Sequence, residues 1–517
     1  MTMPVSRKQY GILALLVLVY LLNGIHSINT WSITADEGSH LSYGIRIIKG
    51  DPERTNPEKD NSKMPISVLN AIPRGVEQLF SGDTLSRGDW GTHDTINGRY
   101  ITLLFSILII LLVFRWSSRL YGVTAGLFSA FLFCFCPNNL AAAVLVTTDT
   151  YAVFFLLATF YLLWRYCHTQ SRRHLVWFSV MLGFSQLAKQ SLFHLYILAP
   201  FCFIVYTVVW KQRPRLLPAL KNLLIAGVTS WIIINAGFIF YDMNTRLGDY
   251  HFMSSLFTKV QALLPSGLPV PFSSAFITGL DQAKFYDQLG GGFANSSFGN
   301  VTILGHSSTG GSFWYYYFVT LFFKTPIPVL ALSAWSIIVL VRKTAFRNFI
   351  ANEFFLLAPI LYFLLLMSFL YNTQVGIRHM LFVYPLLFIL CGILVKYLPA
   401  RRGFIVMGVS GLLLLASVLR YYNNYFAYTN EFIADKTNAW KYVGASNLNF
   451  NQGYLLLDRY LKQHPDVQQA PETPAKGKFV IVLDHYLDIW NTGKYAWLRK
   501  EKPIGEVDHV FLLFDVK

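Results

Sequence analysis

Long runs of apolar residues, separated by short polar stretches, dominate the chain up to about position 420. Many of them approach the length of about 20 residues that an α-helix needs to cross roughly 30 Å of hydrocarbon. We therefore predict eleven membrane-spanning helices, at 8–27, 100–116, 119–136, 148–166, 174–190, 192–210, 219–240, 314–341, 353–371, 379–397 and 403–420. Three hydrophilic stretches remain, at 28–99, 241–313 and 421–517.

The last hydrophilic stretch has a different pattern, in which short runs typical of strands alternate with a helical run. The strand-like runs are Phe479–Leu483 and Val510–Phe514, the helical run is Gln452–Gln463, and Gln468–Lys478 has the prolines of a loop. The pattern predicts a small α/β domain over 421–517. It would follow a membrane module over 1–420 with outer loops 28–99 and 241–313.

One predicted span carries an unusual charge. Lys324 falls in the middle of 314–341 and precedes Pro326 and Pro328. An unpaired lysine is costly in hydrocarbon, so we expect it to face the protein interior or a kink made by the two prolines.

Composition supports the membrane interpretation. Hydrophobic residues make up 54% of the chain and charged residues only 14%, whereas soluble domains carry about 25% charged residues. All five cysteines lie in or beside apolar runs, without the spacing of zinc ligands, so we expect them to be packing residues. The first apolar run follows Arg7 and Lys8 and is not followed by a convincing cleavage site, so it predicts an uncleaved span.

The net charge of +16 comes mainly from clusters between the apolar runs, which argues against a nucleic-acid partner. If the N-terminus is cytoplasmic, the short inner connections hold 17 basic residues and the short outer ones only Lys189 and Arg378. Cytoplasmic loops of membrane proteins carry such an excess. The asymmetry predicts that the C-terminus and all three hydrophilic stretches lie outside the cytoplasm.

Two acidic positions then fall on the outer side. Asp36 and Glu37 open an amphipathic helix just after the first span, and we expect this helix to lie along the membrane surface. Thr34 and Glu37 have the spacing of a capping box, which explains Glu37 but not Asp36. Asp149 stands at the outer end of the fourth span, where an N-cap role is the alternative to a catalytic one.

Basic side chains are predicted on the same outer side of the membrane as Asp36 and Asp149. Lys189, His194, Arg378 and His379 flank outer connections, and Lys189 and Arg378 depart from the basic-inside rule. An anion at the outer interface, such as a lipid phosphate, would account for them. A carboxylate could orient or deprotonate an acceptor hydroxyl while these cations stabilise a departing phosphate.

Several short motifs, spread along nearly the whole chain, resemble those of a known group of enzymes. They are Asp36-Glu37, Pro137-Asn138-Asn139 with Thr147-Thr148-Asp149, Lys324-Thr325-Pro326, Gly376-Ile377-Arg378-His379 and Ser446-Asn447-Leu448-Asn449. In these motifs the chain resembles GT-C fold glycosyltransferases of the group related to protein O-mannosyltransferases and lipid A aminoarabinose transferases (glycosyltransferase family 39-like).

The resemblance implies an all-α polytopic membrane fold that transfers a sugar from a polyprenyl phosphate, usually with inversion. It implies that Asp36, Glu37 and Asp149 are catalytic, with Asp36 as the base or acceptor-orienting carboxylate. It also implies that Lys189, Arg378 and His379 contact the donor phosphate. We expect a bacterial inner-membrane enzyme of the cell envelope whose acceptor is a protein, lipid or glycan.

The chain departs from its relatives in two places. Lys63-Met64-Pro65-Ile66 stands where they often have His-Pro-Pro-Leu, and Asn449-Phe450 stands where they have Asp-Trp. An inactive paralogue is therefore one alternative; a secondary transporter and a lipid-binding or scaffold protein are the others. Asp36, Glu37 and Asp149 could hold a divalent cation, but no tight ligand spacing supports one, so we predict no metal or other cofactor.

Overall fold

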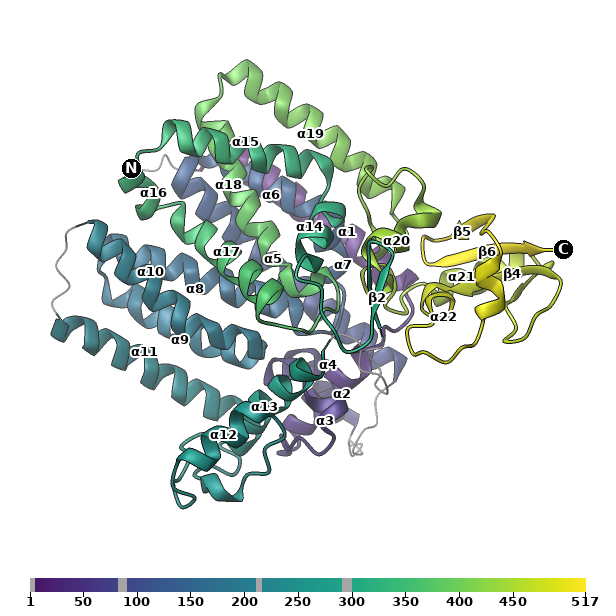
Figure 1. Cartoon of the computed structure of the whole chain (residues 1–517). Coiled ribbons are helices and arrows are strands. Elements are labelled where there is room, and N and C mark those ends of the chain that lie inside the picture. The colour runs from purple at the N-terminus through teal and green to yellow at the C-terminus, as the bar shows by residue number, and fades with distance from the viewer. Residues whose placement is uncertain (1–4, 82–90, 211–215, 291–299) are drawn as a thin grey trace.

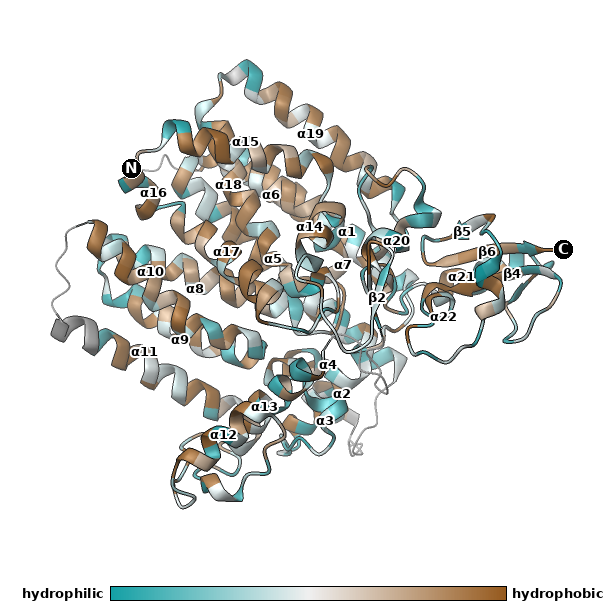
Figure 2. Cartoon of the chain, in the orientation of Figure 1, coloured by the Kyte–Doolittle hydropathy of each residue, from teal (hydrophilic) through white to brown (hydrophobic). Residues whose placement is uncertain are grey.

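The computed structural model describes residues 5–81, 91–210, 216–290 and 300–517. Parts of two predicted outer loops, 82–90 and 291–299, lie outside the described residues. The fold is mainly helical: a bundle of long apolar helices carries polar segments at one end, and the C-terminal residues form a separate group of strands beside them (Figure 1). The ribbons coloured as hydrophobic concentrate in the bundle (Figure 2).

A helix forms at each of the eleven predicted apolar segments. These helices are α1 (Arg7–Thr30), α5 (Thr92–Tyr121), α6 (Val123–Cys134), α8 (Asp149–Thr169), α9 (Arg172–Ala188), α10 (Leu195–Val209), α11 (Leu216–Gly237), α14 (Tyr316–Lys324) with α15 (Ile327–Lys343), α17 (Phe354–Phe369), α18 (Val383–Tyr397) and α19 (Ala400–Arg420).

In the part of the chain that the structure describes, fewer helices are long and apolar enough to cross a membrane than the eleven that the apolar pattern predicts. Among the described residues, five helices are long and apolar enough to cross a membrane: α1, α5, α8, Gln190–Val209 and Arg401–Arg420. The pair α14 and α15 makes a sixth if it counts as one span, and α6, α17 and α18 are shorter apolar helices. The chain is thus an integral, multi-pass membrane protein, and the count of eleven spans stays a prediction.

The predicted span 314–341 is broken rather than straight. Helices α14 and α15 meet at a bend of 112°, because Pro326 cannot donate to the helix ladder and starts a new helix instead. Lys324 ends α14 with only 1% of its surface exposed. Its Nζ donates to the carbonyls of Phe426 and Asn447 at 2.7 Å each, so this lysine faces the interior, as expected.

Burial separates central helices from peripheral ones. In the most apolar window of α8, 83% of residues are buried, whereas the corresponding shares are 28% in α1 and 22% in α19. α18 is also central, with a nearly continuous buried run from Val383 to Leu394 packed against α5, α6, α15 and α17. The five cysteines are all free and buried, which confirms their packing role.

The first outer loop folds back onto the bundle. It contains α2 (Glu37–Ile48), α3 (Pro57–Asp60), η1 (Pro65–Ser67) and α4 (Val68–Ser81). The predicted amphipathic helix is present as α2, and most of its residues are buried against η1, α4 and α5, so its apolar face meets protein; its place along the membrane surface stays a prediction. Gly44 lets α2 approach η1 closely, since a Cβ there would stand 2.4 Å from the Ser67 carbonyl oxygen.

The remaining connections contribute short elements. They are α7 (Pro137–Ala142), η2 (Gln190–His194), η3 (Leu247–Asp249), α12 (Ser255–Leu263), α13 (Ser274–Leu289), the antiparallel pair β1 (Val301–Ile303) and β2 (His306–Ser308), α16 (Phe346–Ala351) and η4 (Ile377–Met380).

The C-terminal residues contain a four-stranded sheet in the order β3-β4-β6-β5, with β3 parallel to β4 and the other pairs antiparallel. Its strands are β3 (Val467–Gln469), β4 (Gly477–Val482), β5 (Gly505–Val507) and β6 (Phe511–Val516). The accompanying helices are η5 (Tyr425–Ala427), η6 (Lys436–Asn438), α20 (Ala439–Val443), η7 (Ala445–Asn447), α21 (Tyr454–Gln463), α22 (Leu483–Leu487) and η8 (Ala496–Lys500). Both predicted strands and the predicted helix are therefore present.

Candidate functional site

Asp36 lies at the start of α2, between two cationic side chains from distant parts of the chain. Arg378 in η4 donates from Nη1 to Oδ2 of Asp36 at 2.7 Å. Lys63, just before η1, places its Nζ 3.9 Å from Oδ1. The Asp36 side chain keeps 27% of its surface exposed, so it remains accessible while it is paired.

These two cations decide the protonation state of Asp36. Burial by itself would raise the pKa of the carboxyl, but the charges of Lys63 and Arg378 outweigh it and hold the pKa well below the usual range. The same pairing, with Asp36 and Asp149, raises the pKa of Arg378 against the effect of its burial. Asp36 is therefore an anion at any physiological pH.

The charged insert 51–63 serves to place Lys63. Arg46 of α2 forms an ion pair with Asp60 at 3.1 Å, and Arg54 donates from Nη2 to the carbonyl of Lys63 at 2.7 Å. Arg54 also donates to the Ala275 carbonyl of α13 at 2.9 Å, which joins the first outer loop to the second. The insert is thus a folded support for the site.

Asp149 and Lys189 form a second ion pair in the same neighbourhood. Asp149 is the first residue of α8, Lys189 follows α9, and their Oδ1 and Nζ atoms lie 2.5 Å apart. Asp149 makes no side-chain cap for the helix; Thr148 is the N-cap residue. The two ion pairs belong to one charged group, because Asp149 contributes to the electrostatic environment of Arg378.

A narrow cavity of about 20 Å³ connects this group with the C-terminal residues. Asp149, Arg378 and Lys324 line it together with Ser446 and Asn447. The volume suffices for about one water molecule. A larger ligand would therefore enter this cavity only if the side chains of its wall moved.

Glu37 occupies a different environment from its neighbour Asp36. It is fully buried, and its two oxygens accept from Nε and Nη2 of Arg99 at 2.8 and 2.6 Å. It also accepts from the backbone N–H groups of Thr34 at 2.8 Å and Val146 at 3.0 Å. The Thr34 contact is half of the predicted capping box; the Thr34 hydroxyl makes no hydrogen bond in the part of the chain described.

His40 is a further site residue, and one that the sequence did not single out. It lies one helical turn after Asp36 on α2 and is 3% exposed. Its burial and the nearby Lys63 charge hold the pKa of the ring well below the usual value, so His40 is neutral. Its Nδ1 has no hydrogen-bond partner among the described residues. The i, i+4 spacing from Asp36 was the available signal.

The tail motif at 446–452 forms one wall of the site. The Phe450 ring stacks under the Arg378 guanidinium, with Cζ 4.6 Å from the ring centroid. The Phe450 carbonyl accepts from the N–H of Ala35 at 3.2 Å, which docks the motif beside Asp36. Asn449 donates from Nδ2 to Asp484 of α22 at 2.6 Å.

The two predicted histidines differ in their surroundings. His379 follows Arg378 within η4 and is half-buried. His194 instead bridges the hydroxyls of Tyr362 and Tyr371, at 2.9 Å from Nδ1 and Nε2 respectively, and thereby links η2 to α17. We interpret His194 as a packing residue.

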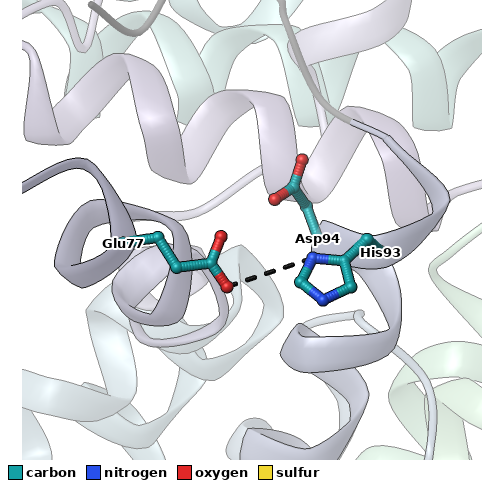
Figure 3. A group of neighbouring side chains, drawn as sticks. All are labelled: Glu77, His93 and Asp94. Carbon is teal, nitrogen blue, oxygen red and sulfur yellow. Dashed lines mark ion pairs between the residues drawn. The ribbon is translucent and has the colours of Figure 1, made fainter. Parts of the chain in front are cut away.

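One group of side chains has metal-ligand geometry in the described ranges, and it lies elsewhere. Glu77, His93 and Asp94 offer ligand atoms within 4.8 Å of one another (Figure 3). Glu77 accepts from Asn97 at 3.1 Å, and Asp94 from the N–H of Gly91 at 2.8 Å, so both carboxylates already serve the start of α5. Asp36, Glu37 and Asp149 do not form such a group among these residues.

Sequence comparison locates a partial match. A family model described as dolichyl-phosphate-mannose-protein mannosyltransferase matches residues 92–240, a stretch that includes Asp149 and Lys189. No protein with curated annotation shows significant sequence similarity to the chain.

Structural comparison covers the whole chain. ArnT from Cupriavidus metallidurans, bound to undecaprenyl phosphate, superposes with a TM-score of 0.52 at 14% identity over 98% of both chains. The chain has a GT-C fold. Apo ArnT matches 80% of this chain and 64% of its own length, with a TM-score of 0.51 and 14% identity. The oligosaccharyltransferase of Archaeoglobus fulgidus gives 0.47 at 13% identity, over 80% of this chain and 55% of its own.

The GT-C fold explains why the charged group could form. The match covers less than two thirds of the length of apo ArnT. It covers 98% of the length of the ArnT chain bound to undecaprenyl phosphate. In this GT-C chain the starts of α2 and α8, the end of α9 and η4 lie together, so four short segments each contribute one charge. Asp36, Asp149, Lys189 and Arg378 are thereby brought together.

Proposed function

We propose that the chain is a membrane glycosyltransferase. It would move a sugar from a polyprenyl-phosphate donor to an acceptor hydroxyl. The observation that carries the proposal is the carboxylate of Asp36, held ionised between Lys63 and Arg378 within reach of solvent. The GT-C fold and the partial match to a mannosyltransferase family support it, as does the undecaprenyl phosphate bound to ArnT.

The proposed reaction is a single displacement. The acceptor oxygen attacks the anomeric carbon as its proton passes to a carboxylate oxygen of Asp36. The bond from the anomeric carbon to the phosphate oxygen breaks, and both electrons leave with the polyprenyl phosphate. Attack on the face opposite the leaving group inverts the anomeric centre.

The cations have distinct roles in this scheme. Arg378 and Lys189 would stabilise the charge that develops on the departing phosphate, with His379 beside them. Lys63 would keep Asp36 ionised and fixed while the acceptor binds. Asp149 would hold Lys189 in position at the start of α8 until the phosphate arrives. Glu37 joins the site only indirectly, through the segment of Val146 that precedes Asp149. No step in this scheme requires a metal ion.

We further propose the topology that the basic residues predict. The N-terminus would be cytoplasmic, and eleven spans would carry the site and the outer loops to the outer face of a bacterial inner membrane. Residues 1–420 would form the catalytic module and residues 421–517 an extracytoplasmic domain. The acceptor would be a protein, lipid or glycan of the cell envelope.

The test is transfer of sugar from a radiolabelled polyprenyl-phosphate donor by purified protein in lipid vesicles. Asp36→Asn should abolish transfer, at least 100-fold, without lowering the yield of folded protein. Asp466→Asn is the matched control, because Asp466 also pairs with a lysine, at 2.8 Å from Lys478, but lies in an exposed turn just before β3. Full activity of Asp36→Asn would refute the proposal. Donor uptake into sealed vesicles without transfer would favour a transporter.

A further inference from the structure

A second cavity lies inside the helix bundle, far from the charged group. It has a volume of about 130 Å³ and is a groove lined by side chains of α8, α9, α10 and α11. Its lining is apolar apart from the polar groups of Tyr166, Tyr196 and Asn222. It is several times larger than the cavity at Asp149, and nothing in the proposed reaction uses it.

The side chains that flank the cavity on α10 and α11 are of the kind expected to face the hydrocarbon of the bilayer. The floor is formed by α8 and α9, which pack on each other, while α10 packs on α8 and α11 packs on α9. Side chains next to the opening point outward: Phe201 and Ile204 of α10 are 52% and 57% exposed, and Leu224 of α11 is 66% exposed. The ribbon of α10 is coloured mostly as hydrophobic (Figure 2).

Such a groove fills with hydrocarbon. A void beside a packed wall loses dispersion contacts, and liquid acyl chains surround this one. Two small residues, Ala226 and Gly227, form part of the lining. A Cβ placed on Gly227 would meet no atom within 4 Å, so the backbone of α11 leaves open space there.

A polar pair marks one end of the groove. Asn222 donates from Nδ2 to the Tyr166 hydroxyl oxygen at 2.6 Å. Because that oxygen accepts this bond, its own proton is free to donate. Tyr166 is only 6% exposed and lines the groove, and its hydroxyl donates to no acceptor among the residues described. A buried donor of this kind requires an acceptor.

The position of Tyr166 identifies the membrane leaflet. Tyr166 follows Asp149 by 17 positions on one helix (166 − 149), which corresponds to about 26 Å along the axis. The hydrocarbon core is roughly 30 Å thick, so Tyr166 lies near the membrane surface opposite the charged site. Lys221, exposed and adjacent to Asn222, adds a positive charge at that surface.

We infer that this groove binds an anionic glycerophospholipid of the leaflet opposite the catalytic site. One acyl chain fills the space between α10 and α11, its ester carbonyl accepts from the Tyr166 hydroxyl, and its phosphate pairs with Lys221. The site is distinct from that of the polyprenyl donor, whose phosphate would bind at the other membrane surface. The inference depends on the membrane placement and not on the transfer reaction.

The test uses full-length protein in nanodiscs and a phosphatidylglycerol that carries a diazirine on its acyl chain. Ultraviolet crosslinking followed by peptide mapping should label α8–α11 peptides at the groove. Gly227→Phe should fill the space and reduce this labelling at least fivefold. Leu224→Phe, which adds the same ring to the outer surface of α11, should leave it unchanged. Equal labelling of the two variants would overturn the inference.

Two further measurements distinguish an anionic glycerophospholipid from other lipids. Tyr166→Phe, which keeps the ring and removes the donor, should weaken labelling severalfold and would serve alone if Gly227→Phe failed to fold. A matched phosphatidylcholine probe should label the groove less than phosphatidylglycerol does. A polyprenyl-phosphate probe that labelled the groove in preference to both would overturn the inference and assign the groove to the donor tail.

Discussion

Arg378 donates a 2.7 Å hydrogen bond to Asp36 although 342 positions of sequence separate them. The bond joins the start of α2 to the turn before α18. Phe450 packs on the face of the same guanidinium, at 4.6 Å, so three remote segments converge on one side chain. The planar guanidinium can pair with a carboxylate at its edge and stack on a ring with its face, which an ammonium group cannot do.

The first prediction concerns this contact. Arg378→Gln should lower kcat for sugar transfer by about 10²–10³-fold, the usual effect of removing one stabilising donor. It should also raise the pKa of Asp36, since one of the two cations that oppose the effect of burial would be gone. An acidic limb should therefore appear, or move to higher pH, in the profile of kcat/KM against pH.

Arg378→Lys separates charge from shape. It keeps the positive charge near Asp36 but loses the stacking on Phe450, so we expect a loss of about tenfold and little change in the pH profile. A pH profile that shifts equally in Arg378→Gln and Arg378→Lys would mean that geometry, not charge, controls the pKa of the Asp36 carboxyl.

The second prediction separates Glu37 from Asp36. Glu37 is fully buried and bound to Arg99, so Glu37→Gln leaves that arginine buried without a charged partner. Breaking such a pair costs about 3–5 kcal/mol. Thermal unfolding in detergent should show a clear loss of stability, whereas activity per folded molecule should fall far less than in Asp36→Asn.

A double-variant cycle checks the pairing. Glu37→Gln with Arg99→Gln should destabilise by less than the sum of the two single changes, because the second change removes the uncompensated charge. Additive effects, or a complete loss of activity in folded Glu37→Gln, would make Glu37 a catalytic group after all.

The third prediction concerns the ion pair of Asp149 and Lys189. In the structure Lys189 is engaged by Asp149 at 2.5 Å. Asp149→Asn should release Lys189 and remove a negative charge near the incoming phosphate. Polyprenyl phosphate should then bind about tenfold more tightly, a change of ~1.4 kcal/mol, while transfer falls. Lys189→Met should weaken the binding of polyprenyl phosphate. Identical dissociation constants for Asp149→Asn and Lys189→Met would contradict the assignment of Lys189 to the donor phosphate.

Sequence patterns predict the helices well because burial in a membrane and burial in a protein both demand apolar residues. The pattern at 314–341 showed the break only through Lys324 and Pro326, and the 112° angle between α14 and α15 follows from packing. The amphipathic pattern of α2 predicted a helix correctly. It could not show whether the apolar face meets lipid or, as here, α4 and η1.

For the site, topology placed Asp36, Asp149, Lys189 and Arg378 on one side without revealing which pairs form. The pairing of Asp36 with Arg378 depends on tertiary contacts that no local pattern encodes. In the sequence Lys63 was visible only as the first residue of a departing motif, since its role depends on how Arg46 and Arg54 fold residues 51–63. Asn449 stands where the resemblance implies a carboxylate. In the fold the carboxylate of Asp484, 35 positions away, accepts a hydrogen bond from Asn449.

The last prediction concerns Asp484. Burial raises the pKa of its carboxyl from 3.8 to about 6, against the lowering effect of the Asn449 hydrogen bond. Between these two pH values the folded protein binds a proton that the unfolded chain has released. Stability should therefore fall as the pH rises from about 4 to about 6 and then level off.

Asp484→Asn should remove this dependence, since an amide cannot ionise but its carbonyl still accepts from Asn449. The variant should be more stable than the native protein at pH 7, by about 1 kcal/mol once partial solvent exposure is allowed for, and no more stable at pH 4. Asp466→Asn provides the control, because this exposed carboxylate pairs with Lys478 and its pKa is lowered, not raised. Parallel stability curves for Asp484→Asn and the native protein between pH 4 and 7 would show that Asp484 ionises freely in the fold.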